Sequence, residues 1–205
     1  MSNVRLAGAL LIIGFGLVVI GSVVGPPGLY QEPELDARLE IITANPGNWL
    51  ASNGAWALAA LITAAGLLVF SLGLRDTDTG TLGLVAGAAI ILGAISFTIQ
   101  LYLRQVSPGE SYERTTLFTL GFIWLTLIGL LTYGVVFLRA QYPKWLASLF
   151  IGIPILLAAL AIILGSRFYF NLPPQVFYLL TLLAGIVFAR RGGAPLTTEK
   201  PGYEA

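Results

Sequence analysis

Polar side chains inside two otherwise apolar segments are the part of this sequence best suited to bind a small molecule. Their hydroxyl, amide and guanidinium groups can hydrogen-bond to a neutral or lipophilic molecule, and helical spacing places each set on one face. If the two faces meet, they form a narrow polar cleft, in which Gln100 and Arg104 are the strongest hydrogen-bonding groups. The candidate cleft residues are Ser96, Gln100 and Arg104 in one segment and Thr119, Thr126 and Tyr133 in the other.

A purely structural role explains the same residues. Ser and Thr in membrane helices often bond to a carbonyl of their own helix, and a single interhelical hydrogen bond satisfies a residue such as Gln100. The sequence leaves both interpretations open.

The composition excludes several kinds of chemistry. The chain contains neither Cys nor His, so it has no thiolate nucleophile and no imidazole or thiolate ligand for a metal, haem or iron–sulfur cluster. Motifs of zinc proteases, serine hydrolases and nucleotide-binding loops are also absent from the sequence. With a net charge of +1, it has no basic patch for nucleic acid. We therefore expect no cofactor, no metal, no nucleic-acid partner and no catalytic site.

Apolar stretches dominate the 205 residues, of which 57% are hydrophobic and only 10% charged. Six stretches contain no Asp, Glu, Lys or Arg, and each is close to the roughly 20 residues that a helix needs to cross a bilayer. The sequence predicts an all-α, six-helix transmembrane domain over residues 1–191 and a flexible tail over 192–205. We expect the first stretch to stay in the protein as a helix and not to be a cleaved signal. The predicted spans are 6–25, 52–74, 80–103, 115–138, 145–165 and 172–189.

Basic residues between the spans predict the orientation, because Lys and Arg accumulate on the cytoplasmic side. With both termini in the cytoplasm, the cytoplasmic side carries more of them. That side has Arg5, Arg75, Arg139, Lys144, Arg190, Arg191 and Lys200, against Arg38, Arg104, Arg114 and Arg167 outside. We expect a multi-pass protein of the cell membrane, surrounded by lipid.

The longest loop, residues 26–51, is predicted on the outside. Leu35, Leu39 and Ile42 share one helical face, which indicates a short amphipathic helix on the membrane surface. A turn at Asn45 to Asn48 is expected to end this helix before the second span. The helix could be a lid over the bundle, or a gate or docking site for a partner.

Small residues at helical spacing indicate where helices pack closely in lipid. Pro154 is expected to kink the fifth span, because proline removes a backbone donor. The candidate packing residues are Gly21, Gly25, Gly83, Gly87 and Gly93.

Three segments resemble an uncharacterised bacterial family of six-span membrane proteins, known as domain of unknown function 4386. They are Arg5-Leu6-Ala7-Gly8, Ile42-Thr43-Ala44-Asn45-Pro46, and the run from Gly134 to Leu146 with its Tyr-Pro-Lys-Trp-Leu ending. The region from Ser166 to Pro174 does not match. This resemblance implies a six-span fold and no activity, so it carries over no functional residue.

Three functions are compatible with these features. The first is a non-catalytic accessory or structural subunit of a membrane complex, with other membrane proteins as partners. The second is a transporter or channel for a small neutral or lipophilic molecule, which would use the candidate cleft. The third is a lipid-modifying enzyme that would use Glu110, Glu113 and Arg114 at the outer surface.

Overall fold

The computed structural model describes residues 3–29, 31–32, 34–108, 117–164 and 175–191, in which all regular structure is helical. Five helices, α1, α3, α4, α6 and α7, are long and apolar enough to cross a membrane, whereas α9 has 17 residues. The helices are α1 (Asn3–Val24), α2 (Leu35–Ala44), α3 (Pro46–Gly73), α4 (Gly80–Val106), α6 (Leu117–Arg139), α7 (Lys144–Leu164) and α9 (Gln175–Arg191).

The start of α3 corrects one boundary. The expected turn over residues 45–48 is absent, because α3 begins at Pro46, which occupies the start of the helix, where proline is favoured. Only Asn45 separates α2 from α3. Helix α4, which packs on α3, continues past Arg104 to Val106. With about 1.5 Å per residue, α3 is about 42 Å long and exceeds the roughly 30 Å hydrocarbon core.

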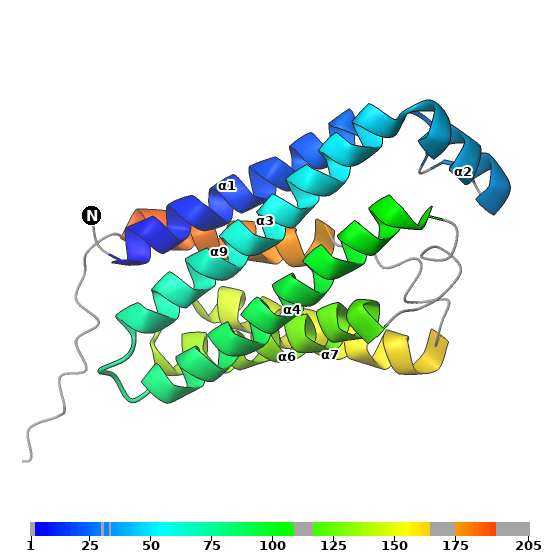
Figure 1. The fold of residues 1–205 in the computed structure, drawn as a ribbon. Helices are drawn as coiled ribbons and strands as arrows, with labels where there is room; N and C mark the ends of the chain where they lie inside the picture. The colour runs from blue at the N-terminus through cyan, green and yellow to red at the C-terminus, as the bar shows by residue number, and fades with distance from the viewer. Residues whose placement is uncertain (1–2, 30, 33, 109–116, 165–174, 192–205) are drawn as a thin grey trace, which may run out of the picture.

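The six long helices form a ring. Going round it, α9 packs on α1, α1 on α3, α3 on α4, α4 on α6 and α6 on α7, and a smaller contact between α7 and α9 closes it. Figure 1 shows α1 and α3 side by side, with α9 behind them and α6 and α7 on the opposite side of α4. Successive helices run in opposite directions, as expected for a chain that crosses a membrane repeatedly.

Glycines make the closest contacts in the ring. A Cβ atom on Gly8 of α1 would lie 2.8 Å from the carbonyl oxygen of Gly185 on α9, and a Cβ atom on Gly134 of α6 would lie 3.0 Å from the carbonyl carbon of Phe150 on α7. Small residues let helix backbones approach in this way where lipid is the solvent. The α1–α3 contact uses Gly14, Gly21 and Gly66, and the α4–α6 contact uses Gly93, Gly121 and Gly129.

The α7–α9 contact is of a different kind. Among the described residues, no glycine brings these two helices together, and Gly152 of α7 has open space where a Cβ atom would stand. Pro154 lies inside α7, as the sequence shows, and is buried. The α7–α9 seam is therefore the loosest in the ring.

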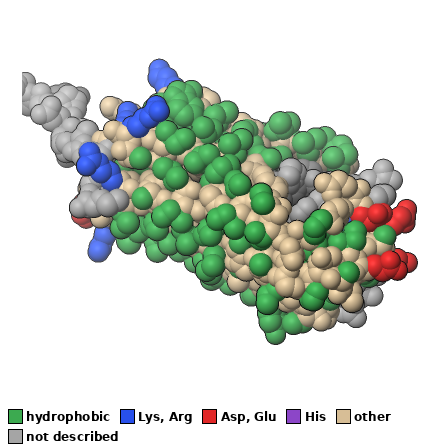
Figure 2. Space-filling model, turned by 90° about the horizontal axis from the view of Figure 1, so that it is seen from above, with side chains coloured by type: hydrophobic (Ala, Val, Ile, Leu, Met, Phe, Trp, Pro, Cys, Tyr) green, Lys and Arg blue, Asp and Glu red, His purple; other side chains and the backbone are tan. Residues whose placement is uncertain are grey.

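Most basic side chains lie at one end of the bundle, and most acidic side chains lie at the other end (Figure 2). We call the end with most of the Lys and Arg the basic end and the end around α2 the acidic end. Figure 1 shows α2 at the acidic end, projecting beyond α1 and α3. From the helix termini, the acidic end has Glu32, Glu34, Asp36 and Glu40, and the basic end has Arg5, Arg75, Arg139, Lys144, Arg190 and Arg191, with Asp76 and Asp78 beside Arg75.

Some predictions fall outside the described residues. These are the tail over 192–205, the start of the fourth predicted span, and the segment 165–174, which holds the end of the fifth span and the start of the sixth. Glu110, Glu113 and Arg114, on which the enzyme hypothesis depends, also lie outside them.

Candidate functional site

The two predicted polar faces meet at the interface between α4 and α6. A Cβ atom on Gly93 would lie 2.9 Å from Thr126 Oγ1, and a Cβ atom on Gly121 would lie 2.9 Å from Ser96 Oγ. The hydroxyl of each helix therefore lies against a glycine of the other helix. The α4–α6 interface is therefore closely packed around Gly93 and around Gly121.

Tyr133 belongs to a different contact, which joins three helices near the basic end. Its hydroxyl lies 2.7 Å from Ser71 Oγ on α3, and Ser71 Oγ lies 2.7 Å from the carbonyl oxygen of Gly83 on α4. Each hydroxyl has one proton to donate. If Ser71 donates to Gly83, Tyr133 donates either to Ser71 or to the Leu67 carbonyl oxygen, which is 2.9 Å away. A Cβ atom on Gly87 would lie 3.2 Å from Ser71 Oγ, so this glycine makes room for the contact.

The remaining candidate cleft residues lie toward the acidic end. Gln100 is buried at 2% exposure, while Arg104 and Thr119 are half-buried. None of the three lacks an interaction partner. The indole nitrogen of Trp49 donates to the Arg104 carbonyl oxygen at 3.4 Å, which ties α3 to α4 at this end. A single cleft that reaches all six residues stays a prediction.

Four of the five predicted packing glycines, all except Gly25, lie at helix contacts. Gly21 of α1 faces the Trp56 ring so closely that any side chain would collide with it, and Ser52 Oγ donates to the Gly21 carbonyl oxygen at 2.6 Å. Gly25 is buried just after the end of α1. Gly83 receives the hydrogen bond from Ser71 described above. Ser52 of α3 thus joins α3 to α1, and Ser71 of α3 joins it to α4.

A cavity of about 30 Å³ lies inside the ring, between α3, α4, α6 and α9. Three threonines border it, namely Thr63 of α3, Thr126 of α6 and Thr181 of α9. The rest of its wall comes from aliphatic and aromatic side chains, among them Tyr178. Of the predicted cleft residues, Thr126 is the one that borders this cavity.

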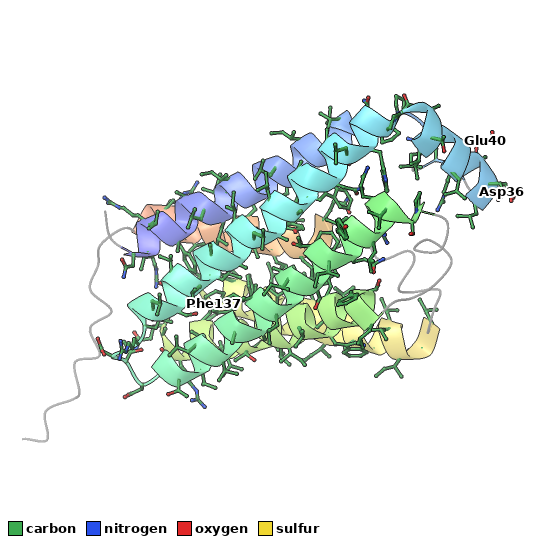
Figure 3. The ribbon with its side chains drawn as sticks, viewed as in Figure 1. Asp36, Glu40 and Phe137 are labelled. Carbon is green, nitrogen blue, oxygen red and sulfur yellow. The ribbon has the colours of Figure 1, made fainter. Side chains whose placement is uncertain are left out.

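An aromatic cluster fills the basic half of the ring. Phe137 is fully buried at its centre (Figure 3), with ring centroids 4.9 Å from Phe150 of α7, 5.8 Å from Phe70 of α3 and 5.9 Å from Phe188 of α9. Tyr142, in the α6–α7 loop, joins the cluster 5.4 Å from Phe137. One side chain of α6 therefore contacts three other helices.

Arg191 fastens the end of α9 to this cluster. Its guanidinium carbon lies 4.7 Å above the Tyr142 ring, and its Nη2 donates to the Gln141 carbonyl oxygen at 3.0 Å. Gln141 has φ of 55°, a left-handed conformation that costs roughly 1–2 kcal/mol in a residue with a side chain. Burial raises the pKa of Tyr142 to about 12, against an opposing effect of Arg191. Tyr142 is therefore a neutral phenol at physiological pH and presents its ring to the cation.

Several of these residues have no strong signal in the sequence. Gly8, Gly185 and Ser71 are ordinary small residues in apolar stretches, and their importance depends on which helices become neighbours. Gly14 and Gly21 are seven positions apart and so share a helical face, which is a signal that could have placed Gly14 in the α1–α3 contact.

Comparison of the chain with protein-family models, with curated proteins and with solved structures finds no match. The resemblance to the family of unknown function therefore stays a prediction. The fold itself defines the class: this is a helical membrane protein, with long apolar helices packed through glycine contacts and an aromatic cluster.

Proposed function

We propose that this chain is a non-catalytic subunit of a membrane complex, and that it crosses the cell membrane six times with both termini in the cytoplasm. The observation that carries this proposal is a pair of features at the acidic end that the ring itself does not use. These are the projecting helix α2 and an open glycine face on α3.

The six-span arrangement is supported by helix length and charge. Five helices meet the length and hydropathy of a span, and α9 covers about 26 Å at 1.5 Å per residue, close to the roughly 30 Å core. Because the helices alternate in direction, both described chain ends lie at the basic end. Placing this end in the cytoplasm agrees with the preference of Lys and Arg for that side.

Helix α2 has little contact with the ring. Its Ile42 packs in a small cluster with Leu29 and Trp49, while Leu35 and Leu39 stay half-exposed. Figure 3 shows Asp36 and Glu40 pointing away from the bundle. An apolar edge beside exposed carboxylates suits a partner that also reaches beyond the membrane.

The glycine face lies on the half of α3 that follows α2. Gly54 is exposed and has open space where a Cβ atom would stand, and Gly47 and Ala51 are exposed on the same face. Small residues facing lipid let a second helix approach closely. Within the ring they have no such neighbour, so we assign this face to a helix of another subunit.

The substitution Gly54→Leu tests the assignment. The leucine fits into open space, so we expect the thermal midpoint of the isolated chain to stay unchanged. We expect it to reduce the fraction of the chain in its complex at least tenfold, because the added side chain separates the two helices. The measurement is the mass distribution of particles extracted from the native membrane in polymer-bounded discs.

Gly152→Leu on α7 is the matched control, since this glycine also faces open space but has the bulky Leu149 and Ile155 three residues away, where Gly54 has Ala51 and Ala57. It should leave the complex intact. The proposal fails if the wild-type chain is always recovered as a monomer, or if both substitutions reduce the complex equally.

A further inference from the structure

The cavity inside the ring is apolar although three threonines border it. Thr181 Oγ1 donates to the Tyr178 carbonyl oxygen at 3.0 Å, Thr126 Oγ1 lies against Gly93, and Thr63 Oγ1 lies against Gly14. The hydroxyls are therefore directed at helix backbones, and the wall of the cavity is almost entirely carbon. Thr63 Oγ1 is buried and makes no hydrogen bond among the described residues, so an occupant meets a wall of carbon with one unpaired hydroxyl.

The chemistry of the cavity favours hydrocarbon over water. Its volume of about 30 Å³ exceeds the roughly 10–15 Å³ that a water needs, but a bound water also needs two to four polar partners, and Thr63 Oγ1 is a single unpaired hydroxyl. If the cavity is empty, the side chains around it lose dispersion contacts. Ala60 of α3 and Ala94 of α4 keep the space open, because any larger side chain at either position would enter it.

On the side of the ring where α9 meets α6 and α7, the helices are less tightly packed than elsewhere. Helix α9 reaches α6 through the edge-to-face pair Phe122–Phe177, with ring centroids 5.6 Å apart. It meets α7 without a close glycine contact among the described residues, while Arg191 fastens it at the basic end. Among the described residues that line the cavity, none belongs to α7, so on this side the wall consists of α6 and α9.

We propose that this cavity binds the end of a saturated hydrocarbon chain, which enters from the surrounding lipid between α7 and α9. The chain belongs to a phospholipid or to a free fatty acid, which share this chemistry. The cavity holds a terminal segment, and the rest of the chain lies along the seam.

Photo-crosslinking tests this site in the full-length protein. The protein is placed in vesicles of phosphatidylcholine that contain either a phosphatidylcholine or a free fatty acid with a diazirine at the chain end. Crosslinked residues are then mapped by mass spectrometry. We expect crosslinks at Thr63, Thr126 or Thr181 in addition to lipid-facing residues such as Leu58, and the arm that produces them identifies the source of the chain.

Ala94→Leu fills the cavity and should reduce the cavity crosslinks at least fivefold, without changing those at Leu58. Ala60→Leu does the same from α3, and Ala94→Val is a smaller substitution for use if a leucine variant does not fold. Ala65→Leu, on the exposed face of α3, is the matched control and should change neither set. Crosslinks confined to lipid-facing residues in the wild type, or cavity crosslinks that persist in the filled variants, would overturn the proposal.

Discussion

Replacing Gly8 by leucine is expected to separate α1 from α9 and to destabilise the protein by about 3 kcal/mol, the upper part of the usual range for overpacking. A Cβ atom at this position would lie 2.8 Å from the Gly185 carbonyl oxygen and 2.9 Å from the Ala189 backbone nitrogen. Both neighbours are backbone atoms, which cannot rotate away as a side chain can. The whole helix must therefore move. The measurement is the thermal midpoint of the purified protein in detergent.

Gly16→Leu on the same helix is the matched control. Gly16 has no atom within 4 Å of the position a Cβ atom would take. We expect this variant to keep the wild-type midpoint. Equal midpoints for Gly8→Leu and Gly16→Leu would show that α1 and α9 are not in backbone contact.

Phe137→Ala is the second substitution with a large expected effect. The side chain is fully buried and contacts aromatic rings from α3, α7 and α9, so its removal leaves a void at the point where four helices meet. Loss of a buried phenylalanine costs about 3–5 kcal/mol. We expect a lower thermal midpoint and faster proteolysis at the basic end, measured as the rate of trypsin cleavage at Arg190 and Arg191.

Leu138→Ala is the neighbouring control. Leu138 is 48% exposed, faces lipid in the proposed arrangement, and should be replaceable with less than about 1 kcal/mol of destabilisation. If both substitutions had the same effect on the midpoint, the aromatic cluster would not be a centre of stability.

The helices themselves could be predicted from the sequence with good accuracy. Long stretches without charge correspond to α1, α3, α4, α6 and α7, because only a helix satisfies its own backbone in lipid. The exception at the start of α3 is local: the run Asn45-Pro46-Gly47-Asn48 favours a turn, but Pro46 is also well suited to the first position of a helix.

The arrangement of the helices was harder to predict. Spacing places Thr126 and Tyr133 on one face of α6, yet Thr126 lies against Gly93 of α4 whereas Tyr133 contacts Ser71 of α3. Which helix a face meets depends on crossing angles and on pairs far apart in the chain, such as Gly8 and Gly185. A cavity depends on where these large and small side chains fail to fill the space, which helical periodicity cannot reveal.

The proposed six-span topology is the central claim, and the absence of cysteine from the chain allows a direct test. Single cysteines replace the exposed residues Glu40, Asp78 and Arg190, and intact cells are treated with a maleimide that does not cross membranes. We expect Glu40→Cys to be labelled from outside, and Asp78→Cys and Arg190→Cys to be labelled only after the membrane is opened. Labelling of Arg190→Cys but not Asp78→Cys from outside would contradict the six-span arrangement. Labelling of both Asp78→Cys and Arg190→Cys, but not Glu40→Cys, would reverse the orientation.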